Sequence, residues 1–410
     1  MYRLQTVICL ALAVRAHPML DAPLDQHQMT SADGGTVSIR LERREKHNIH
    51  HQLTRGSAQT RQTQTNNNDL EYIGTLNLGD NLDFVDVVWD TGSQWLIVAS
   101  DYCNSCDAER KYTQDDDQSF SVVDWEAKEL YFGIGYVYGY HANTAVCTRA
   151  NENTCTDMDF ILMTYQEDLH DIGGIAGLAT GGSWWSEGDL VVQKLYESGL
   201  IDRPVFGFYL TGTDGRSFLD IGGLYKDAVR DINELVWMDV VEDDFWWTNY
   251  ITAFGITYAD TGKTRVKAIK NRQMAFTDSG TSCTYIPAPY FEMIMGALDN
   301  ALPNMSQNWW TGERTLPCED IGNAPIISFE FGGYWFTMKP EDYINNWYGE
   351  CWVCMFENTG QDDYWLLGDT FLRGYYSVHD YESMRFGFAP HSTSDKPAPF
   401  VRNEKRRQAE

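Results

Sequence analysis

The sequence predicts an all-β protein built from two related lobes, with a few short helices and a cleft between the lobes. Short apolar β-type runs separated by turns recur from residue 70 onward, whereas helical patterns are few. One tetrapeptide pattern, an Asp on a glycine turn with hydroxyl neighbours, occurs twice. The length of 410 residues also exceeds one compact core and fits two lobes with accessory segments.

The first 16 residues have the features of a secretory signal peptide. Arg3 precedes an apolar stretch over residues 4–14, and Val14-Arg15-Ala16 offers small residues at a cleavage point. No later stretch approaches the roughly 18 apolar residues that cross a bilayer, so we expect no membrane span. We expect the protein in the secretory pathway, either secreted or in an acidic compartment like a lysosome or vacuole.

Residues 17–66 differ in composition from everything after them and end near the polar run 63–68. They are open to two interpretations, a disordered basic leader or an inhibitory propeptide. We expect a propeptide, because the segment follows a signal peptide and because the family resemblance described below implies one. Physically, a cationic segment would lie across an anionic cleft at neutral pH and leave once the carboxylates protonate. The cationic and histidine residues of this segment include Arg40, Arg43, Arg44, Lys46, Arg55, Arg61, His47, His50 and His51.

Two lobes follow, over residues 67–230 and 231–390, and then a polar tail over residues 391–410 that we expect to be flexible. Strand patterns cover residues 71–78, 84–89, 95–99 and 130–136, and helical patterns cover residues 189–198 and 289–298. The tail lacks the hydrophobic end that a lipid-anchor signal requires.

The repeated tetrapeptides are Asp90-Thr91-Gly92-Ser93 and Asp278-Ser279-Gly280-Thr281, and each follows an apolar strand pattern. A matched glycine motif follows each one: Ile175-Ala176-Gly177 ends 85 residues after Gly92, and Leu366-Leu367-Gly368 ends 88 residues after Gly280. The order and spacing indicate an internal duplication. Two such lobes would bring two carboxyl groups together across one water, where they share a proton. One carboxylate can then take a proton from the water while the other carboxyl donates one, as peptide hydrolysis requires.

These motifs resemble those of the pepsin-like aspartic proteases, whose shared-proton dyad is well established. The likeness runs from about residue 70 to residue 390 and includes residues 89–93, 364–369 and 386–390. It implies a bilobal acid protease fold and an aspartic endopeptidase that cleaves between bulky apolar residues at acid pH. It further implies a monomer with polypeptide substrates, its own propeptide as inhibitor, and no metal or organic cofactor.

The resemblance also implies roles for residues around the dyad. Asp90 and Asp278 would be catalytic. Gly92 and Gly280 would let backbone N–H groups approach the carboxylates, Ser93 and Thr281 would donate to the outer oxygens, and Thr91 and Ser279 would link the two turns. The flap and substrate-binding positions would be Phe132, Gly133, Ile134, Val88, Ile175 and Phe276, although the last three are equally well explained as core.

The flap departs from the family pattern. Phe132 stands where the family usually has Tyr, and Ile97 stands where it has the Trp that hydrogen-bonds that Tyr, so no donor is orphaned. Two interpretations remain: apolar packing holds the flap, or Tyr131 reaches inward by a one-residue shift. We expect the first.

Nine cysteines become eight if Cys9 leaves with the signal peptide, and an even number in an exported chain suggests disulfides. The resemblance implies the pairs Cys103–Cys106 and Cys318–Cys351. For the remaining four we expect Cys147–Cys155 and Cys283–Cys354. Cys103 and Cys106 also fit a redox motif or half of a zinc site, but a structural disulfide is the better interpretation.

The chain has 31 Lys and Arg against 59 Asp and Glu, a net charge of -28, which excludes nucleic-acid binding as a main role.

Tryptophan doublets occur at residues 184–185, 246–247 and 309–310. We expect most of them to pack in the protein interior, but exposed doublets can bind sugars. The departure of the flap leaves a non-catalytic binding protein of this fold as an alternative function, and the aromatic doublets leave a two-carboxylate carbohydrate-active enzyme as another. Asn304 heads a glycosylation sequence.

Overall fold

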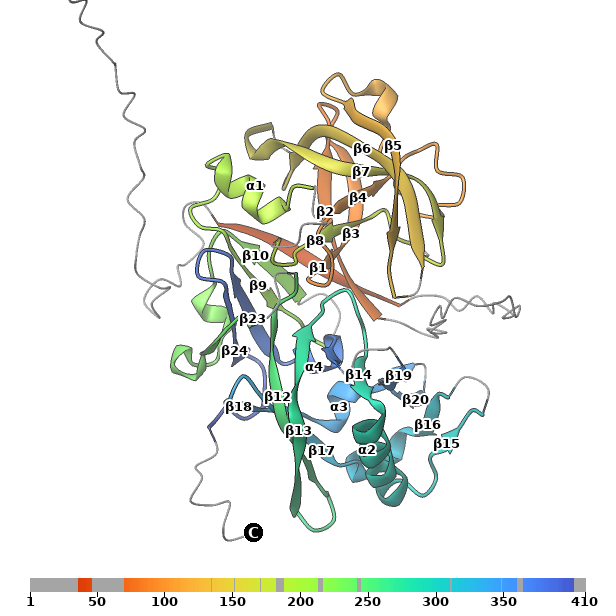
Figure 1. Cartoon of the computed structure of the whole chain (residues 1–410), viewed down its shortest axis with the longest axis vertical. Helices are drawn as coiled ribbons and strands as arrows, with labels where there is room; N and C mark the ends of the chain where they lie inside the picture. The colour runs from red at the N-terminus through yellow and green to blue at the C-terminus, as the bar shows by residue number, and fades with distance from the viewer. Residues whose placement is uncertain are drawn as a thin grey trace, which may run out of the picture.

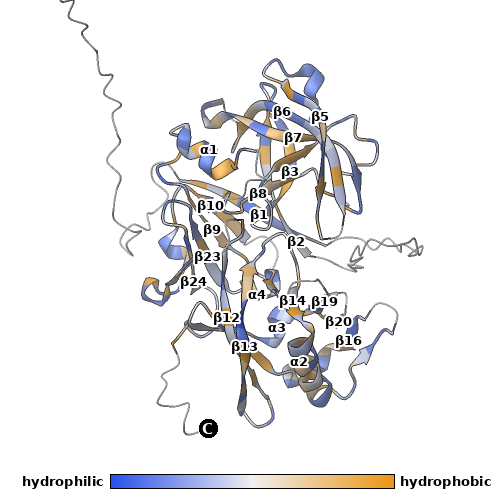
Figure 2. Cartoon of the chain, viewed as in Figure 1, coloured by the Kyte–Doolittle hydropathy of each residue, from blue (hydrophilic) through white to orange (hydrophobic). Residues whose placement is uncertain are grey.

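The computed structural model describes residues 36–45, 70–133, 135–150, 152–169, 171–181, 188–212, 217–241, 245–309, 312–347, 349–359 and 364–401. Strands dominate these residues and helices are short, so the predicted all-β, bilobal architecture is confirmed (Figure 1). Figure 2 places the apolar residues mainly on strands that face the interior, while outer loops and hairpins are hydrophilic.

The first lobe is a set of antiparallel and parallel strands ordered β2-β3-β8-β4-β7-β6-β5 within a larger sheet. Its elements are β2 (Leu70–Leu78), β3 (Asp83–Asp90), β4 (Leu96–Ala99), β5 (Ser121–Tyr131), β6 (Tyr136–Cys147), β7 (Cys155–Glu167), β8 (Gly174–Gly177) and the helix α1 (Val191–Glu197). The strand patterns of the sequence fall on β2, β3, β4 and the β5–β6 hairpin, and the first helical pattern falls on α1.

Six further strands continue this sheet across the middle of the molecule, in the order β11-β24-β23-β9-β10-β1. They are β1 (Val37–Glu45), β9 (Val205–Tyr209), β10 (Ser217–Ile221), β11 (Val236–Asp239), β23 (Tyr375–Asp380) and β24 (Arg385–Pro390). Because β9 pairs with β23, strands from both halves of the sequence form one continuous sheet. This sheet joins the lobes and fixes how they face each other.

The second lobe contains a seven-stranded sheet, β18-β17-β12-β13-β22-β14-β21, and a small sheet, β15-β16-β20-β19. Their strands are β12 (Thr248–Thr257), β13 (Thr264–Thr277), β14 (Thr284–Pro287), β15 (Ser306–Gln307), β16 (Arg314–Pro317), β17 (Ile326–Phe331), β18 (Tyr334–Met338), β19 (Ile344–Trp347), β20 (Glu350–Val353), β21 (Met355–Asn358) and β22 (Trp365–Leu367). The helices are α2 (Ala288–Ala301), α3 (Pro340–Tyr343) and α4 (Asp369–Leu372). The second helical pattern falls on α2.

The two lobes repeat one strand arrangement around the two tetrapeptides. In the first, β3 pairs in parallel with β8, which pairs antiparallel with β4, and β4 pairs in parallel with β7. In the second, β13 pairs in parallel with β22, which pairs antiparallel with β14, and β14 pairs in parallel with β21. This equivalence has the form that the internal duplication predicts.

Part of the segment expected to be a propeptide is a strand of the joining sheet. β1 pairs with β10 over Val37–Leu41 and with β2 over residues 42–45, and Leu41 is fully buried. Its apolar residues Ile39 and Leu41 fill the core, so the described residues 36–45 lie in the sheet and not across a cleft. Residues 46–66, with most of the predicted basic cluster, lie outside the described residues, as does the predicted signal peptide.

The expectation of a flexible tail is wrong for residues 391–401. His391 and Lys396 are buried, and Phe400 forms a β-bridge with Trp335. Lys396 Nζ lies 3.0 Å from Asp342 Oδ2 and donates to the carbonyl of Arg373. The polar composition of residues 391–410 predicted a solvated segment. In residues 391–401, however, polar groups such as the Lys396 ammonium have hydrogen-bond and ion-pair partners in the protein interior.

Candidate active site

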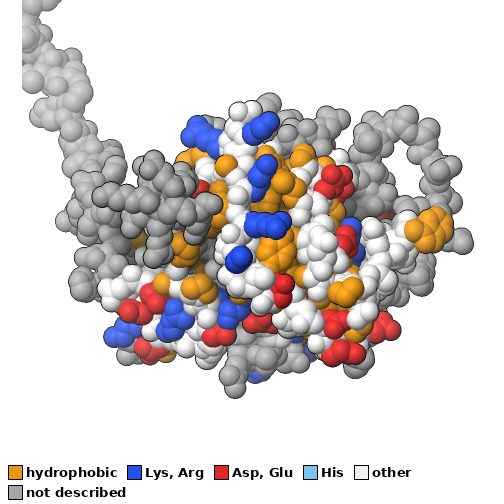
Figure 3. All heavy atoms as spheres, turned by 90° about the horizontal axis from the view of Figure 1, so that it is seen from below, with side chains coloured by type: hydrophobic (Ala, Val, Ile, Leu, Met, Phe, Trp, Pro, Cys, Tyr) orange, Lys and Arg blue, Asp and Glu red, His pale blue; other side chains and the backbone are white. Residues whose placement is uncertain are grey.

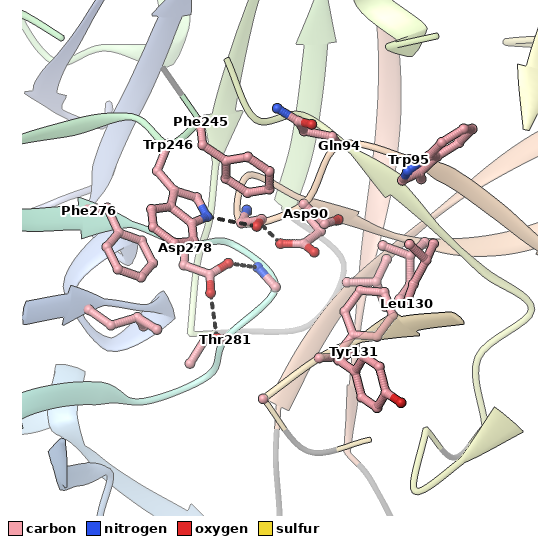
Figure 4. A pocket seen from close by; sticks show the side chains of 18 of the residues that line it. Asp90, Gln94, Trp95, Leu130, Tyr131, Phe245, Trp246, Phe276, Asp278 and Thr281 are labelled. Atoms are coloured by element: carbon pink, nitrogen blue, oxygen red, sulfur yellow. Dashed lines mark hydrogen bonds between the residues drawn. The ribbon is translucent and has the colours of Figure 1, made fainter. Parts of the chain in front are cut away.

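Asp90 and Asp278 occupy equivalent places at the ends of β3 and β13. The side chains of both are buried, with 7 % of each residue exposed. A Cβ built on Gly92 would lie 2.8 Å from Asp278 Oδ1, and one on Gly280 would lie 2.6 Å from Asp90 Cγ. Each glycine turn therefore lies directly against the carboxyl group of the other lobe, and only glycine permits this approach. Figure 4 shows the two carboxyl groups reaching the same pocket from opposite sides.

Backbone and side-chain donors orient the two carboxyl groups. The Gly92 N–H donates to Asp90 Oδ1 at 2.7 Å, and the Gly280 N–H donates to Asp278 Oδ1 at 2.9 Å. The Thr281 hydroxyl donates to Asp278 Oδ2 at 2.6 Å. These bonds hold the carboxyl groups in fixed orientations in the pocket.

The expected counterpart on the other lobe is absent: the buried Ser93 Oγ has no hydrogen-bond partner among the described residues. The expectation that Ser93 orients an outer oxygen of Asp90 is therefore wrong for this structure. A serine hydroxyl can rotate away from a carboxylate at little cost, whereas the added methyl of Thr281 restricts its rotamer.

Thr91 and Ser279 link the two turns beneath the carboxyl groups. The Thr91 N–H donates to Ser279 Oγ at 3.1 Å, and the Ser279 N–H donates to Thr91 Oγ1 at 3.0 Å. Their hydroxyls then donate across the lobes, from Thr91 to the Thr277 carbonyl at 3.0 Å and from Ser279 to the Trp89 carbonyl at 2.7 Å. Four buried hydrogen bonds thus fix the spacing of the two turns, and with it the spacing of the carboxyl groups.

The surroundings of Asp278 favour its neutral form. Burial raises its pKa well above the usual range of an aspartic acid, and the charge of Asp90 raises it further. The hydrogen bonds from Thr281 and Gly280 oppose the shift and are outweighed. The site therefore favours a neutral carboxyl group at Asp278, next to a second carboxyl group.

A cavity of about 480 Å³ surrounds the two carboxyl groups and is lined from both lobes. Val88, Ile175 and Phe276, which the resemblance placed at substrate-binding positions, line it, as do Phe132 and Gly133. Ile134 lies outside the described residues. The other apolar or aromatic lining residues include Trp95, Ile97, Leu130, Tyr131, Leu169, Ile172, Phe245, Trp246, Tyr285, Tyr364 and Leu366. Apart from the dyad, the lining residues that the structure describes carry no charged side chain, so this lining fits bulky apolar groups better than charged ones.

The β5–β6 hairpin covers one side of this cavity. Phe132, at its tip, packs against the buried apolar cluster that contains Ile97, Val88 and Ile175. Tyr131 is 64 % exposed, and its hydroxyl donates to Glu129 at 2.8 Å. This geometry agrees with the interpretation that apolar packing, and not an inward Tyr131, holds the hairpin.

Trp246 is a cavity residue that sequence reasoning did not place. Its indole N–H donates to the Gly92 carbonyl at 3.0 Å, and its ring stacks on Phe276 with centroids 4.8 Å apart. It thus connects the second lobe to the Asp90 turn (Figure 4). Its neighbour Trp247 is fully buried and donates to the Leu178 carbonyl at 2.8 Å. The doublet at residues 246–247 indicated a possible binding surface in the sequence. Only one of its members reaches the cavity, because neighbouring residues near a strand start point to opposite sides.

Four disulfides form the same pairs as those expected: Cys103–Cys106, Cys147–Cys155, Cys283–Cys354 and Cys318–Cys351. Cys283–Cys354 ties the segment after the Asp278 turn to the start of β21, and Cys103–Cys106 lies in the apolar cluster under Phe132.

Asn304 is exposed. Of the other tryptophan doublets, Trp309 is 85 % exposed, and residues 184, 185 and 310 lie outside the described residues. No helix among the described residues is long and apolar enough to cross a membrane.

Comparison with known proteins agrees with this geometry. Residues 71–391 match the family described as eukaryotic aspartyl protease. Gastricsin of Oryctolagus cuniculus is 27 % identical over 337 residues, which cover 78 % of this chain and 81 % of gastricsin. Pepsin A of Sus scrofa is 28 % identical, covering 78 % of this chain and 82 % of that protein. The vacuolar aspartic protease of Candida albicans is 28 % identical, covering 80 % of this chain and 76 % of that protein.

Proposed function

Because this chain belongs to the eukaryotic aspartyl protease family, we propose that it is an aspartic endopeptidase with Asp90 and Asp278 as its catalytic pair. The observation that carries the proposal is the meeting of the two carboxyl groups, each packed against the glycine turn of the other, with a raised pKa at Asp278. The intact links between Thr91 and Ser279 further support a site built for catalysis.

In the proposed reaction, a water lies between the two carboxyl groups. Asp90, as the carboxylate, takes a proton from this water, whose oxygen attacks the carbonyl carbon of the scissile peptide bond. Asp278, as the neutral acid, donates its proton to the carbonyl oxygen. When the C–N bond breaks, Asp90 gives the proton that it took from the water to the leaving amine. Asp278 takes a proton back from the tetrahedral intermediate as the new carboxyl group forms. The pair therefore ends with one proton and can repeat the cycle.

The proposed substrates are polypeptides with bulky apolar residues on both sides of the cleaved bond. The cavity supports this, since Val88, Ile175 and Phe132 supply apolar surface from one lobe and Phe276 and Trp246 supply it from the other. The hairpin that carries Phe132 would close over the substrate and exclude water.

We also propose that the protein is made with a signal peptide (residues 1–16) and an inhibitory propeptide (17–66), followed by lobes over residues 67–230 and 231–390. The four disulfides support passage through the oxidising secretory pathway, towards secretion or an acidic compartment. The proposed mature protein is a monomer, glycosylated at Asn304. Removal of the propeptide would take β1 out of the joining sheet, so another segment would have to cover β2 and β10.

The test is digestion of a denatured protein at acid pH by the wild type and by Asp278→Asn, with and without a pepstatin-type inhibitor. We expect the wild type to cleave the protein and Asp278→Asn not to cleave it. The inhibitor should abolish cleavage by the wild type. Cleavage should also be lost as pH rises far enough to ionise both carboxyl groups. Thr337→Ala, a change at a polar residue that does not line the cavity, should cleave like the wild type.

A non-catalytic binding protein is the second candidate, because Phe132 and Ile97 replace the polar pair that usually joins flap and core in this family. It predicts that a folded wild type binds the inhibitor or a peptide but cleaves nothing. Hydrolysis of a polysaccharide that the inhibitor leaves unaffected would instead support the carbohydrate-active alternative.

A further inference from the structure

The hairpin between β12 and β13 carries a basic strip that contrasts with the acidity of the whole chain. Residues 263–272 contain five cations and no Asp or Glu, in a chain with a net charge of -28. The cations are Lys263, Arg265, Lys267, Lys270 and Arg272, which we call the basic strip. All five residues are exposed. Figure 3 shows Lys and Arg side chains gathered along the middle of the face at which this hairpin ends.

Six cations elsewhere in the described residues have carboxylate partners. Lys194 pairs with Asp189 and Arg203 with Glu382, and the same holds for Arg230, Lys339, Arg385 and Lys396. Within the described parts of the chain, Lys263, Arg265, Lys267 and Lys270 form no ion pair with a carboxylate. These four cations of the strip therefore present positive charge that the described part of the protein leaves uncompensated.

The strand geometry arranges this charge in a line. Lys263, Arg265 and Lys267 are alternate residues, so they point to one side of the strand at intervals of about 6.7 Å. β13 pairs with β12 over residues 264–268 and again over residues 273–276, while β22 pairs only with Ala275–Thr277. Among the described strands, none pairs with the other edge of residues 264–268, so a ligand can approach the side chains at this end of the hairpin.

Aromatic rings lie beneath the guanidinium groups of both arginines in the strip. Arg265 lies over the ring of Tyr258 at 5.3 Å, and Arg272 lies over the ring of Tyr250 at 3.8 Å. A guanidinium stacked on a ring keeps its N–H donors in the plane of the fork, directed away from the ring. Arg265 is thus oriented in advance for a tetrahedral oxyanion, which lowers the entropy cost of binding.

We propose that the basic strip binds a linear sulfated polysaccharide, with its sulfate groups on Lys263, Arg265, Lys267 and the two cations that follow. Sulfate esters match the forked donors of arginine, and they stay ionised at acid pH together with Lys and Arg. Asp and Glu side chains lie on both sides of the strip in Figure 3, so a broad anionic surface such as a membrane would meet carboxylates as well. A linear polysaccharide is narrow enough to contact the strip without meeting these carboxylates. The rings of Tyr250 and Tyr258 are covered by the arginines, which leaves no open ring there for the base stacking typical of single-stranded nucleic acids.

The test measures binding of heparin, as a sulfated probe, to the full-length protein by calorimetry over a series of salt concentrations. The variant R265S/K267S removes two charges from the strip. The matched control, R149S/K226S, removes two exposed cations that lie elsewhere. We expect R265S/K267S to bind heparin about tenfold more weakly, with the salt slope reduced by about 2, and the control to bind within about twofold of the wild type. Melting temperatures of both variants should equal that of the wild type, because neither pair is buried.

Equal losses in the two variants, or no heparin binding by the wild type, would overturn the proposal. Equal binding of desulfated heparin would also overturn it, since the sulfates would then be irrelevant. Tighter, strip-dependent binding to phosphatidylserine vesicles or to a single-stranded oligonucleotide would assign the strip to a different class of partner. None of these measurements involves peptide hydrolysis, so the outcome is independent of the proposed catalytic function.

Discussion

Asp90 and Asp278 have different surroundings, although the turns that carry them repeat one sequence pattern. Thr281 donates to Asp278, whereas Ser93 makes no hydrogen bond to Asp90. Burial nevertheless keeps the pKa of Asp278 raised, so the environment of this residue, and not the motif, favours its neutral form. A sequence can therefore indicate the pair of carboxyl groups, while the assignment of the proton needs the three-dimensional site.

Phe132 provides a residue-level test of how the flap works without the usual polar contact. We expect Phe132→Ala to lower kcat/KM for a peptide substrate about tenfold, because the ring would no longer pack on Ile97 and Val88. Phe132→Leu keeps apolar surface and should lose much less. Steady-state kinetics checks this, with Tyr131→Phe as the control, since its hydroxyl contacts Glu129 outside the cavity. A larger loss in Tyr131→Phe than in Phe132→Ala would contradict apolar packing of the flap.

At the level of elements, the sequence predicted what local patterns encode. The strands that end in Asp90 and Asp278, and the helices α1 and α2, follow from periodicity and turn residues. The position of β1 in the joining sheet and the packing of residues 391–401 do not, because both depend on partners distant in sequence. Trp246 illustrates the same limit: its contact with Gly92 spans 154 positions. The polar tail was misjudged because composition gives the polarity of a segment, not whether its polar groups find buried partners.

The packed tail gives an element-level prediction. Lys396 is 2 % exposed and holds residues 391–401 against α3 and α4 through Asp342 and the carbonyl of Arg373. Its replacement by Met would leave the carboxylate of Asp342 without its buried cation, so we expect a loss of about 3 kcal/mol in the free energy of unfolding. Urea denaturation measures this, with Lys226→Met, at an exposed lysine, as the control. A chain that ends at Val401 should match the wild type, and one that ends at Thr393 should be destabilised like Lys396→Met. Full stability of the shorter chain would show that the tail merely rests on the surface.

For the whole molecule, acidification has opposing effects on stability. Protonation of carboxylates reduces the self-repulsion of a chain with a net charge of -28, which stabilises the folded state as pH falls from neutrality. Buried histidines act in the opposite direction. Burial lowers the pKa of His379 to about 3 and that of His391 to about 4. A folded protein with these neutral rings is suited to mildly acid conditions more than to strongly acid ones.

The buried ring of His379 should make the stability of the folded protein depend on pH. It stacks on Phe206 with centroids 4.5 Å apart, in the sheet that joins the lobes, and neither ring nitrogen has a hydrogen-bond partner among the residues that the structure describes. The unfolded chain takes up a proton on this histidine below about pH 6.5, but the folded protein does not until about pH 3. The folded state thus loses stability as pH falls through this range, by up to about 5 kcal/mol at its lower end. His379→Phe keeps a stacked ring that does not titrate, so its melting temperature should exceed that of the wild type by a margin that grows from neutral to acid pH. A margin that stays constant with pH would mean that His379 is already protonated, or solvated, in the folded protein.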